Sequence, residues 1–402
     1  MSNDKGKPRL LVLTSTFPRW MGDHEPPFVF ELARRLTTRF DVTVLAPHAP
    51  GARVDEMMDG VKVHRFRYAP APLEQLAYDG GIPVKLRRKR LLVGLVPVFL
   101  VAQAIAAFRL SYQLRPQAVH AHWLIPQGAL GVLIARLTRP APRLLVTAHG
   151  ADVFGFGSAL ASWLKRRVIQ SADILTVPSK AVADQVLELH GHTHRLEILP
   201  MGTDLHNRFV PNTIADPVYT LVFSGRLVPK KGVDTLLQAL QLVIARYPEC
   251  RLLVLGDGPE RDTLQRLTRH LGIAENVHFY GPFKNSELPT LLQQARIATL
   301  PFRHSPGGDQ EGLGLATIEC MGCGLPVIIG DVPATRDVVN DGVTGLVVPS
   351  DNPERLAAGI QRLLADPVLA KRLAAAGREF VVDRFDWQNI ASRYARLLGS
   401  KS

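Results

Sequence analysis

Cysteine is scarce in this sequence. Its 402 residues include three cysteines, Cys250, Cys320 and Cys323. An odd number at these spacings does not form a disulfide framework, and the N-terminus lacks the charged and then apolar pattern of a secretory signal. Both absences favour a reducing, cytoplasmic compartment. Cys320 and Cys323 form a C-x-x-C pair without a second pair, so we interpret them as packing residues and not as a metal or redox site.

The sequence also lacks repeats, metal-ligand clusters and nucleic-acid-binding motifs. No repeat with a period of about 20 to 50 residues is evident, which argues against a solenoid. No acidic cluster has the spacing of a metal site, and we expect neither a metal nor a cofactor. The basic residues are not interleaved with aromatic ones, so nucleic acid is not an expected partner.

The positive charge of the chain predicts an anionic partner, since the formal net charge is +12. A basic cluster at residues 85–90, KLRRKR, directly precedes the apolar run Leu91–Phe108. This run is at the lower limit for crossing a bilayer, and Pro97 and Gln103 interrupt it. We therefore favour docking on an anionic membrane surface. The alternative is a helix buried against a sheet, with a solvated basic end.

The length of the chain and its alternating pattern predict an α/β protein with two domains. We expect the buried strands at residues 9–14, 42–46, 61–66, 118–122, 144–147, 174–177 and 196–199, and then at 219–223, 251–255, 277–280, 297–300, 327–329 and 345–348. Linker-like composition around residues 208–218 places an N-terminal Rossmann-like domain at 1–210 and a C-terminal one at 211–380, with a closing amphipathic helix within 381–402. Two doubly wound sheets facing a central cleft would bind ligands at the carboxyl ends of their strands.

Two glutamates mark the most informative stretch of the chain. Glu311 lies in a glycine-rich loop, and Glu319 lies in the helix predicted over 315–321. Gly312 and Gly314 allow the backbone to approach a ligand, and a helix N-terminus presents free N–H groups that can hold a pyrophosphate. The carboxylates then remain for sugar hydroxyls, one glutamate for each sugar. The alternative is a solvated pair on a helix face.

Glu311 and Glu319, followed by Gly-Leu-Pro-Val at 324–327, resemble the paired-glutamate motif of the retaining family-four glycosyltransferases. These group 1 enzymes have the GT-B fold. The resemblance implies that Glu311 contacts the donor hexose and Glu319 the nucleotide ribose, and that the closing helix crosses back to brace the N-terminal domain. The loop residues that it implies for donor binding are Gly312, Leu313 and Gly314.

The stretch 224–232, SGRLVPKKG, follows a predicted strand and opens a helix. Arg226 can grip a phosphate with two donors, and Lys231 adds a point charge, whereas Lys230 is interpreted as solvated. The stretch is similar to the donor-diphosphate loop of the same family, which implies that Gly225, Arg226 and Lys231 bind the donor and that the two cations neutralise the leaving nucleotide. The turn from Tyr280 to Phe283 resembles the family's nucleobase site, which leaves uracil and guanine both open.

In the N-terminal half, His149 resembles the family's active-site histidine, which lies against the donor hexose. Asp152 ends the same motif and is a candidate for acceptor contact, whereas His120 and His122 are interpreted as core or cleft-wall residues. The first loop, FPRWMGDHEPPF, has one glycine where many relatives have two, so Gly22 is the candidate for presenting an N–H to the phosphate. The candidates in this loop for acceptor contact are Arg19, Asp23 and His24.

Together these observations predict a retaining, metal-independent hexosyltransferase, with His149, Glu311, Arg226 and Lys231 as its catalytic residues. Its donor would be a UDP- or GDP-sugar, which is a substrate and not a cofactor. Its acceptor would be a saccharide, lipid-linked because of the basic and apolar N-terminal surface, at the inner face of the cell membrane. The alternatives are a nucleotide-sugar epimerase of the same fold, for which no clear acid–base pair is present, and a non-catalytic membrane scaffold.

Overall fold

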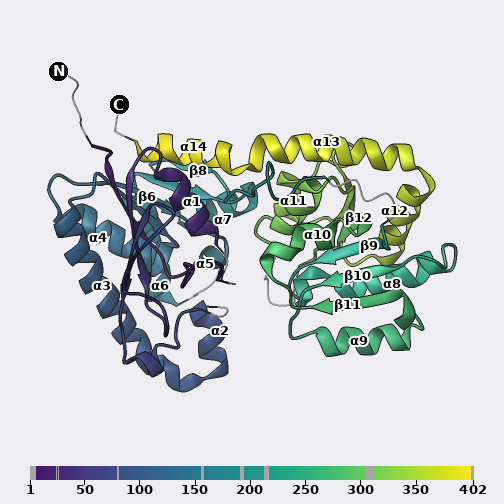
Figure 1. The fold of residues 1–402 in the computed structure, drawn as a ribbon, viewed down its shortest axis with the longest axis horizontal. Helices are drawn as coiled ribbons and strands as arrows, with labels where there is room; N and C mark the ends of the chain where they lie inside the picture. The colour runs from purple at the N-terminus through teal and green to yellow at the C-terminus, as the bar shows by residue number, and fades with distance from the viewer. Residues whose placement is uncertain are drawn as a thin grey trace. The chain divides into compact units, whose positions relative to one another are not determined.

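The chain forms two compact α/β units. The computed structural model describes residues 6–23, 25, 27–78, 81–154, 158–190, 194–211, 217–304 and 311–399. The first unit takes Met1–Pro178, Val182–Gly202 and Ile390–Ser402, and the second takes Ser179–Ala181 and Thr203–Asn389. Each unit has its own sheet and its own hydrophobic core (Figure 1).

The first unit contains an eight-stranded sheet in the order β3-β4-β2-β1-β5-β6-β7-β8. All neighbours pair in parallel except β3 and β4. Its strands are β1 Arg9–Leu13, β2 Asp41–Pro47, β3 Asp55–Met58, β4 Val61–Phe66, β5 Ala118–His122, β6 Arg143–Thr147, β7 Ile174–Val177 and β8 Leu196–Ile198. The strand order reverses at β1, which pairs with both β2 and β5, so the loops after β1, β5 and β6 lie at the switch point where α/β folds bind ligands.

Helices cover this sheet, and α3 and α4 pack against each other beside it (Figure 1). The helices are α1 Phe28–Leu36, α2 Gly81–Arg88, α3 Leu95–Leu114, α4 Ala129–Leu137, α5 Ala151–Phe154, α6 Ala159–Ser171 and α7 Lys180–His190. Short helical turns occur at Ala71–Leu73, Arg90–Gly94 and Leu124–Gly128. The core consists of buried apolar side chains from these strands and helices, as the uninterrupted apolar runs of parallel strands require.

The second unit contains a six-stranded parallel sheet in the order β11-β10-β9-β12-β13-β14. Its strands are β9 Tyr219–Ser224, β10 Leu252–Leu255, β11 Val277–Gly281, β12 Ala295–Leu300, β13 Val327–Gly330 and β14 Leu346–Val348. Here the order reverses at β9, which pairs with β10 and β12. The loops after β9 and β12 therefore lie at the second switch point.

The helices of the second unit lie on both faces of its sheet (Figure 1). They are α8 Val233–Ile244, α9 Arg261–His270, α10 Leu288–Leu292, α11 Leu315–Gly322, α12 Pro353–Ala365 and α13 Pro367–Phe385, with short turns at Pro229–Lys231, Ala274–Asn276, Asn285–Glu287 and Pro333–Asp337. Helix α8 packs against α9 and α12, whereas α11 packs against α13. The last helix, α14 Trp387–Leu398, begins in the second unit, and its residues from Ile390 onward pack in the first.

Candidate functional site

The loop that follows β9, residues 225–232, is packed directly on the end of the neighbouring strand. The N–H of Gly225 donates to Leu255 O at 3.0 Å. A Cβ at Gly256 would lie 2.0 Å from Gly225 O, and a Cβ at Gly232 would lie 2.1 Å from Pro301 O. Because these approaches exclude any side chain, the loop is held at the switch point of the sheet by backbone contacts.

Lys231 and Glu311 form an ion pair in the second unit. Lys231 Nζ donates to Glu311 Oε2 at 2.7 Å, and the two side chains are 12% and 15% exposed. Nζ also lies 4.6 Å from the centroid of the Phe302 ring, a cation–π contact. Burial acts to raise the pKa of Glu311, but the ion pair with Lys231, together with Lys230 and the amide of Gly314, holds that pKa below its ordinary value. Glu311 is therefore a carboxylate at neutral pH.

Helix α11 begins directly after this carboxylate. Gly314 has φ +82°, and a Cβ there would lie 3.3 Å from both Phe302 Cε2 and Thr317 Oγ1. Leu313 is buried and Gly312 is half-buried. The hydroxyl of Thr317 is buried and has no hydrogen-bond partner among the described residues. Within the described part of the chain, the start of α11 therefore offers N–H groups that lack an intrahelical acceptor, and a spare hydroxyl, to a ligand.

Glu319 lies in the second turn of α11 and differs electrostatically from Glu311. Burial raises the pKa of Glu319 to about 7, although the charges of Arg208 and Lys231 act in the opposite direction. The side chain is thus close to half-protonated at neutral pH. Its deprotonated form accepts hydroxyl hydrogen bonds at both oxygens, whereas protonation turns one oxygen into a donor.

The other predicted donor residues lie at the same carboxyl edge of the sheet. Arg226 is exposed on the loop after β9. Tyr280 is 41% exposed near the end of β11, two strands away from β9. Phe283 is partly buried and packs against the hydrophobic core. The structure thus couples Lys231, Glu311 and Glu319, while the predicted base contacts of Tyr280 and Phe283 stay predictions.

Arg303, which the sequence analysis did not single out, clamps the turn that carries Lys231. Its Nε donates to Pro229 O at 2.6 Å, and its backbone N–H donates to Lys230 O at 3.0 Å. Its Nη1 lies 3.0 Å from Asp234 Oδ2 and 2.9 Å from Asp351 Oδ1. The sequence did contain a signal for Arg303, because the residue follows the buried strand β12 by three positions and therefore lies at the switch point.

Arg208 is a second residue that the sequence analysis did not predict. Its Nη2 donates to Asn285 O and to Asn285 Oδ1, the latter at 2.9 Å, and its guanidinium lies 4.7 Å from the centroid of the Phe209 ring. Its charge acts on Glu319, whose pKa it lowers against the effect of burial. Arg208 therefore adds positive potential near the second carboxylate.

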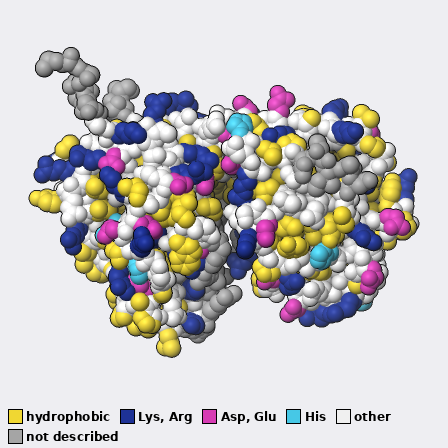
Figure 2. Space-filling view, in the orientation of Figure 1, with side chains coloured by type: hydrophobic (Ala, Val, Ile, Leu, Met, Phe, Trp, Pro, Cys, Tyr) yellow, Lys and Arg dark blue, Asp and Glu magenta, His cyan; other side chains and the backbone are white. Residues whose placement is uncertain are grey.

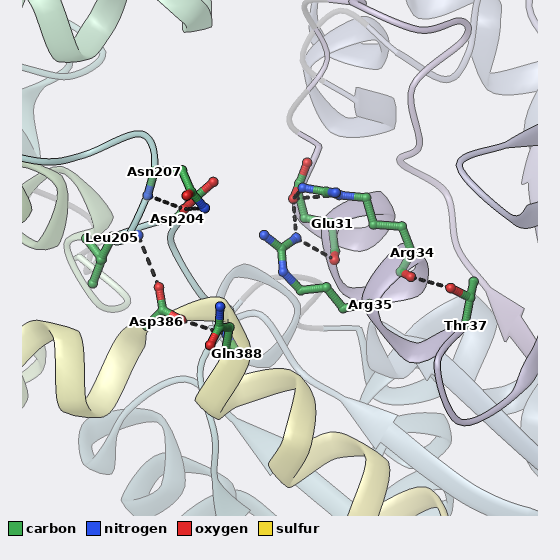
Figure 3. A network of polar contacts seen from close by, with 9 residues as sticks. All are labelled: Glu31, Arg34, Arg35, Thr37, Asp204, Leu205, Asn207, Asp386 and Gln388. Atoms are coloured by element: carbon green, nitrogen blue, oxygen red, sulfur yellow. Dashed lines mark hydrogen bonds and ion pairs between the residues drawn. The ribbon is translucent and has the colours of Figure 1, made fainter.

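The segment that carries Arg208 is tied to the end of α13 and the start of α14. Asp386 accepts from the N–H of Leu205 at 3.2 Å and from the N–H of Gln388 at 2.8 Å, while Asp204 accepts from the N–H of Asn207 at 3.0 Å (Figure 3). These contacts give the segment 203–209 a fixed course within the second unit.

In the first unit, His149 lies at the carboxyl end of β6 among aromatic rings. Its Nε2 is 3.1 Å from His122 Nδ1, and its ring centroid is 5.1 Å from that of Phe28 and 4.7 Å from that of Trp123. Burial lowers the pKa of His149 to about 3 and lowers the pKa of His122 well below its ordinary value. Both imidazoles are therefore neutral at physiological pH.

Polar contacts continue from these histidines towards α14 within the first unit. His120 Nε2 is 2.8 Å from Thr147 Oγ1, which is 2.7 Å from Thr176 Oγ1. The hydroxyl of Tyr394 lies 3.4 Å from Thr176 Oγ1 and donates to Leu199 O at 3.0 Å. The ring of Tyr394 stacks on His120 with centroids 5.4 Å apart. The closing helix thus packs under the strands that carry the histidines.

Asp152 has a structural role that differs from the predicted acceptor contact. The residue is buried, at 4% exposure. Its Oδ1 accepts from the N–H of His149 and its Oδ2 from the N–H of Leu124, both at 2.9 Å. Because both oxygens bind backbone amides, the carboxylate joins the loop after β6 to the loop after β5. Its contact with an acceptor stays a prediction.

The loop after β1 is held by an internal ion pair. Arg19 Nη2 and Asp23 Oδ1 are 2.7 Å apart, and the side chain of Asp23 is fully buried. Gly22 is exposed with φ +80°, and a Cβ there would meet nothing within 4 Å. Gly22 can thus approach a ligand, whereas Asp23 shapes the loop. His24 lies outside the described residues, and the acceptor contacts of this loop stay predictions.

The apolar run after the basic cluster forms a helix with one exposed apolar face. Phe99, Gln103, Ala107 and Ser111 are buried along α3, whereas Val98, Val101, Ile105 and Tyr112 are 49%, 59%, 64% and 75% exposed. Among the described residues, Leu91–Leu114 is the one segment with the length and composition to cross a membrane. Apolar and basic side chains are both exposed on the first unit (Figure 2). The side chains of Arg87, Arg88 and Arg90 lie outside the described set.

Comparison with known proteins shows similarity over the whole chain. The model of the glycosyl transferases group 1 matches residues 207–380, and that of the glycosyl transferase 4-like domain matches residues 27–202. The chain is 30% identical over 408 residues to the GDP-mannose-dependent alpha-(1-6)-phosphatidylinositol monomannoside mannosyltransferase of Mycolicibacterium smegmatis, covering 98% of each chain. The protein of the same name from Mycobacterium tuberculosis is 29% identical over 404 residues, with 97% of this chain and 98% of that one covered.

Solved structures of other proteins share the fold of both units. Sucrose-phosphate synthase from Thermosynechococcus elongatus has a TM-score of 0.76 at 22% identity, with 97% of this chain and 98% of that chain covered. Anabaena Alr3699/HepE in complex with UDP has a TM-score of 0.72 at 18% identity, with 97% and 99% covered. At these identities the likeness establishes the fold.

Proposed function

Because this chain belongs to the group 1 glycosyltransferases, which have the GT-B fold, we propose that it transfers mannose from GDP-mannose to a mannosylated phosphatidylinositol. The transfer retains the anomeric configuration and uses no metal ion. The observation that carries the donor side is the Lys231–Glu311 ion pair at the start of α11, with Glu319 in the next turn. The sugar, the base and the acceptor class of the proposal are those of the mycobacterial relatives.

The leaving group in this proposal is GDP, whose diphosphate needs positive charge. Arg226 and Lys231 supply two cations, and the free N–H groups at the start of α11 and at Gly22 supply partial positive charge. Glu311 and Glu319 then accept hydrogen bonds from the hydroxyls of the hexose and the ribose. Arg226 and Lys231 thus serve in place of a metal ion.

His149 contributes to this proposal as a neutral group. Burial lowers the pKa of its imidazole to about 3, so the ring is uncharged at neutral pH before the donor binds. It therefore orients the hexose by packing and hydrogen bonding and does not stabilise the leaving diphosphate by charge. The acceptor hydroxyl oxygen bonds to the anomeric carbon as the bond to GDP breaks, and its proton passes to the departing phosphate oxygen on the same face.

A transfer assay tests the donor and the stereochemistry. The purified protein is incubated with GDP-mannose, UDP-glucose or ADP-glucose, with and without vesicles that contain phosphatidylinositol monomannoside. We expect acceptor-dependent GDP release and an α-linked mannoside, identified by NMR. The proposal would be contradicted if only UDP-glucose served as donor, if the nucleotide sugar were epimerised, or if no nucleotide were released.

We place the acceptor at an anionic membrane surface, which the first unit contacts through α3 and the basic cluster at 85–90. The support is the row of exposed apolar side chains on α3, since Gln103 faces the interior and does not interrupt it. An apolar helix face beside cations binds in the interfacial plane of anionic membranes. The same face would bring the enzyme to a lipid-linked acceptor.

Vesicle co-sedimentation tests this placement. The double variant Val101→Asp and Ile105→Asp should lose most binding to vesicles that contain phosphatidylglycerol, because each substitution places a charge in the apolar layer. The control is Val368→Asp on α13, where the side chain is 78% exposed outside α3. Equal binding of the double variant and the control would contradict membrane contact through α3.

A further inference from the structure

The turn that ends β5 holds its chain in a strained conformation next to His149. Trp123, the residue after the strand, has φ +74° and ψ +144°. Residues with a Cβ rarely adopt this region. Such strain persists where the surrounding structure over-determines the backbone, and it is typical of functional sites.

Three hydrogen bonds fix this turn. The N–H of Trp123 donates to Thr147 O at 2.8 Å, and Trp123 O accepts from the N–H of Gly128 at 3.0 Å. The N–H of the next residue, Leu124, donates to the buried carboxylate of Asp152 at 2.9 Å. Since Asp152 also accepts from the N–H of His149, one carboxylate sets the position of the turn and of the histidine together.

The strained turn brings two consecutive side chains to the His149 ring from different directions. His122 contacts it through a nitrogen, with 3.1 Å between His122 Nδ1 and His149 Nε2. Trp123 contacts its face, with ring centroids 4.7 Å apart. A residue at φ below zero would direct the chain elsewhere, so the strain is what allows both contacts at once.

We infer that His122, held by the Trp123 turn, is a positioning residue that fixes the orientation and the tautomer of His149. A hydrogen bond between two neutral imidazoles needs one N–H and one lone pair, so His149 Nε2 must take the role opposite to that of His122 Nδ1. Nδ1 of His149 then has the opposite role: it donates if Nε2 accepts, and it accepts if Nε2 donates. Within the described part of the chain Nδ1 makes no hydrogen bond, so this atom is available to the hexose. The inference rests on the proposed function only in giving His149 a substrate.

A pair of amide variants separates positioning from simple packing. In His122→Asn the amide falls near the place of Nδ1, whereas in His122→Gln it falls near that of Nε2. We expect His122→Asn to keep kcat within about threefold of wild type, and His122→Gln to lower kcat by about 100-fold because His149 loses its fixed geometry. The donor KM should change less than threefold in both. A purely structural role for His122 would affect the two variants alike.

The matched control is His120 on the same strand, which is equally buried and bonds to Thr147 and not to His149. His120→Gln should lower the melting temperature without the loss of kcat seen in His122→Gln. Equal kcat losses at His120 and His122, or equal activities of the Asn and Gln variants, would overturn the inference.

NMR of the histidine ring nitrogens gives a readout that needs no activity. In wild type and His122→Asn, 15N shifts should show one tautomer of His149, and in His122→Gln a mixture. An unchanged single tautomer in His122→Gln would overturn the positioning role whatever the enzyme's substrate is. If wild type shows the single tautomer but transfers no mannose, the proposed function fails and the positioning inference stands.

Discussion

Lys231 pairs with the carboxylate of Glu311 in the structure, and in the proposed reaction it also binds the donor diphosphate. Its ammonium pairs with Glu311 at 2.7 Å, and the donor diphosphate would share it. We expect Lys231→Met to lower kcat/KM by about 100- to 1000-fold, as loss of a donor to developing charge does. Steady-state kinetics with the donor measure this effect.

The neighbouring Lys230 is the control for Lys231. It lies on the same turn and is half-buried, but the ion pair at 2.7 Å belongs to Lys231. Lys230→Met should lower kcat/KM by less than about tenfold, consistent with a longer-range charge effect. Equal losses in both variants would mean that the turn responds to net charge and that the Lys231 contact has no special role.

Glu319 predicts a pH dependence of nucleotide binding. Burial raises the pKa of Glu319 to about 7 in the unliganded protein, so below that pH its carboxyl group is mostly protonated. This proton must be released before both oxygens can accept from the ribose hydroxyls. The affinity for GDP should therefore fall as the pH drops, by up to about tenfold per pH unit below 7. Titration calorimetry in two buffers of different ionisation enthalpy should detect proton release on binding at pH 6.5. Glu319→Gln should bind more weakly at pH 8 and show a flat profile.

Single residues show how far the sequence could be read. The spacing of Glu311 and Glu319 predicted a site, and the structure couples both carboxylates to Lys231. His120 and His122 share one face of β5 because side chains alternate along a strand. Periodicity cannot tell which of them meets a partner from another strand, so the contact of His122 with His149 was not predicted. Asp152 was a candidate for acceptor contact because it ends the motif that contains His149, and a sequence motif does not reveal that both of its oxygens accept from backbone amides.

At the scale of elements, Arg303 connects the loop after β12 to the turn that presents Lys231. We expect Arg303→Met to weaken GDP binding by about tenfold and to lower the free energy of unfolding by about 1 to 3 kcal/mol, because Asp234 and Pro229 O lose their donor. Thermal melts with and without GDP separate the two effects.

The control for Arg303 is Arg336, which forms an exposed pair with Asp331 at 2.8 Å in the same unit. Its side chain is 68% exposed, and exposed pairs of this kind contribute little to stability because water screens them. Arg336→Met should therefore leave GDP affinity unchanged. A GDP affinity for Arg303→Met equal to that of this control would show that the clamp does not position Lys231.

The buried strands were the elements that the sequence predicted best. Expected strands at 61–66, 118–122 and 174–177 match β4, β5 and β7 residue for residue. The antiparallel strand β3 was not predicted, because its sequence DEMM is short, acidic and half exposed. The apolar run that begins at Leu91 divides into the end of the short turn Arg90–Gly94 and the helix α3. Neither departure is visible in periodicity, since both depend on packing against neighbouring elements.

At the scale of the whole molecule, the chain is a glycosyltransferase whose first unit includes the last residues of the sequence. Ile390 and Tyr394 are fully buried, and Leu398 is 2% exposed. Each such side chain contributes about 1.5 to 3 kcal/mol, against a total stability of about 5 to 15 kcal/mol for a domain. A chain that ends at Asn389 should therefore show a lower melting temperature for the first unit, with the transition of the second retained in calorimetry.

Tyr394→Phe is the matched variant for this truncation. It keeps the ring against His120 and loses the hydrogen bond from the hydroxyl to Leu199 O at 3.0 Å. The expected cost is about 1 kcal/mol. If the truncated protein melted like wild type, the burial of α14 in the first unit would have no energetic role.

The position of α14 at the end of the chain also affects how the protein is made. The ribosome releases residues from the N-terminus first, and single domains usually fold as they emerge. Here the strands that carry His120 and Thr176 must wait for Tyr394, which is translated after the entire second unit. The first unit is therefore synthesised first and completed last. Until α14 is made, the apolar surface that this helix covers stays accessible to chaperones.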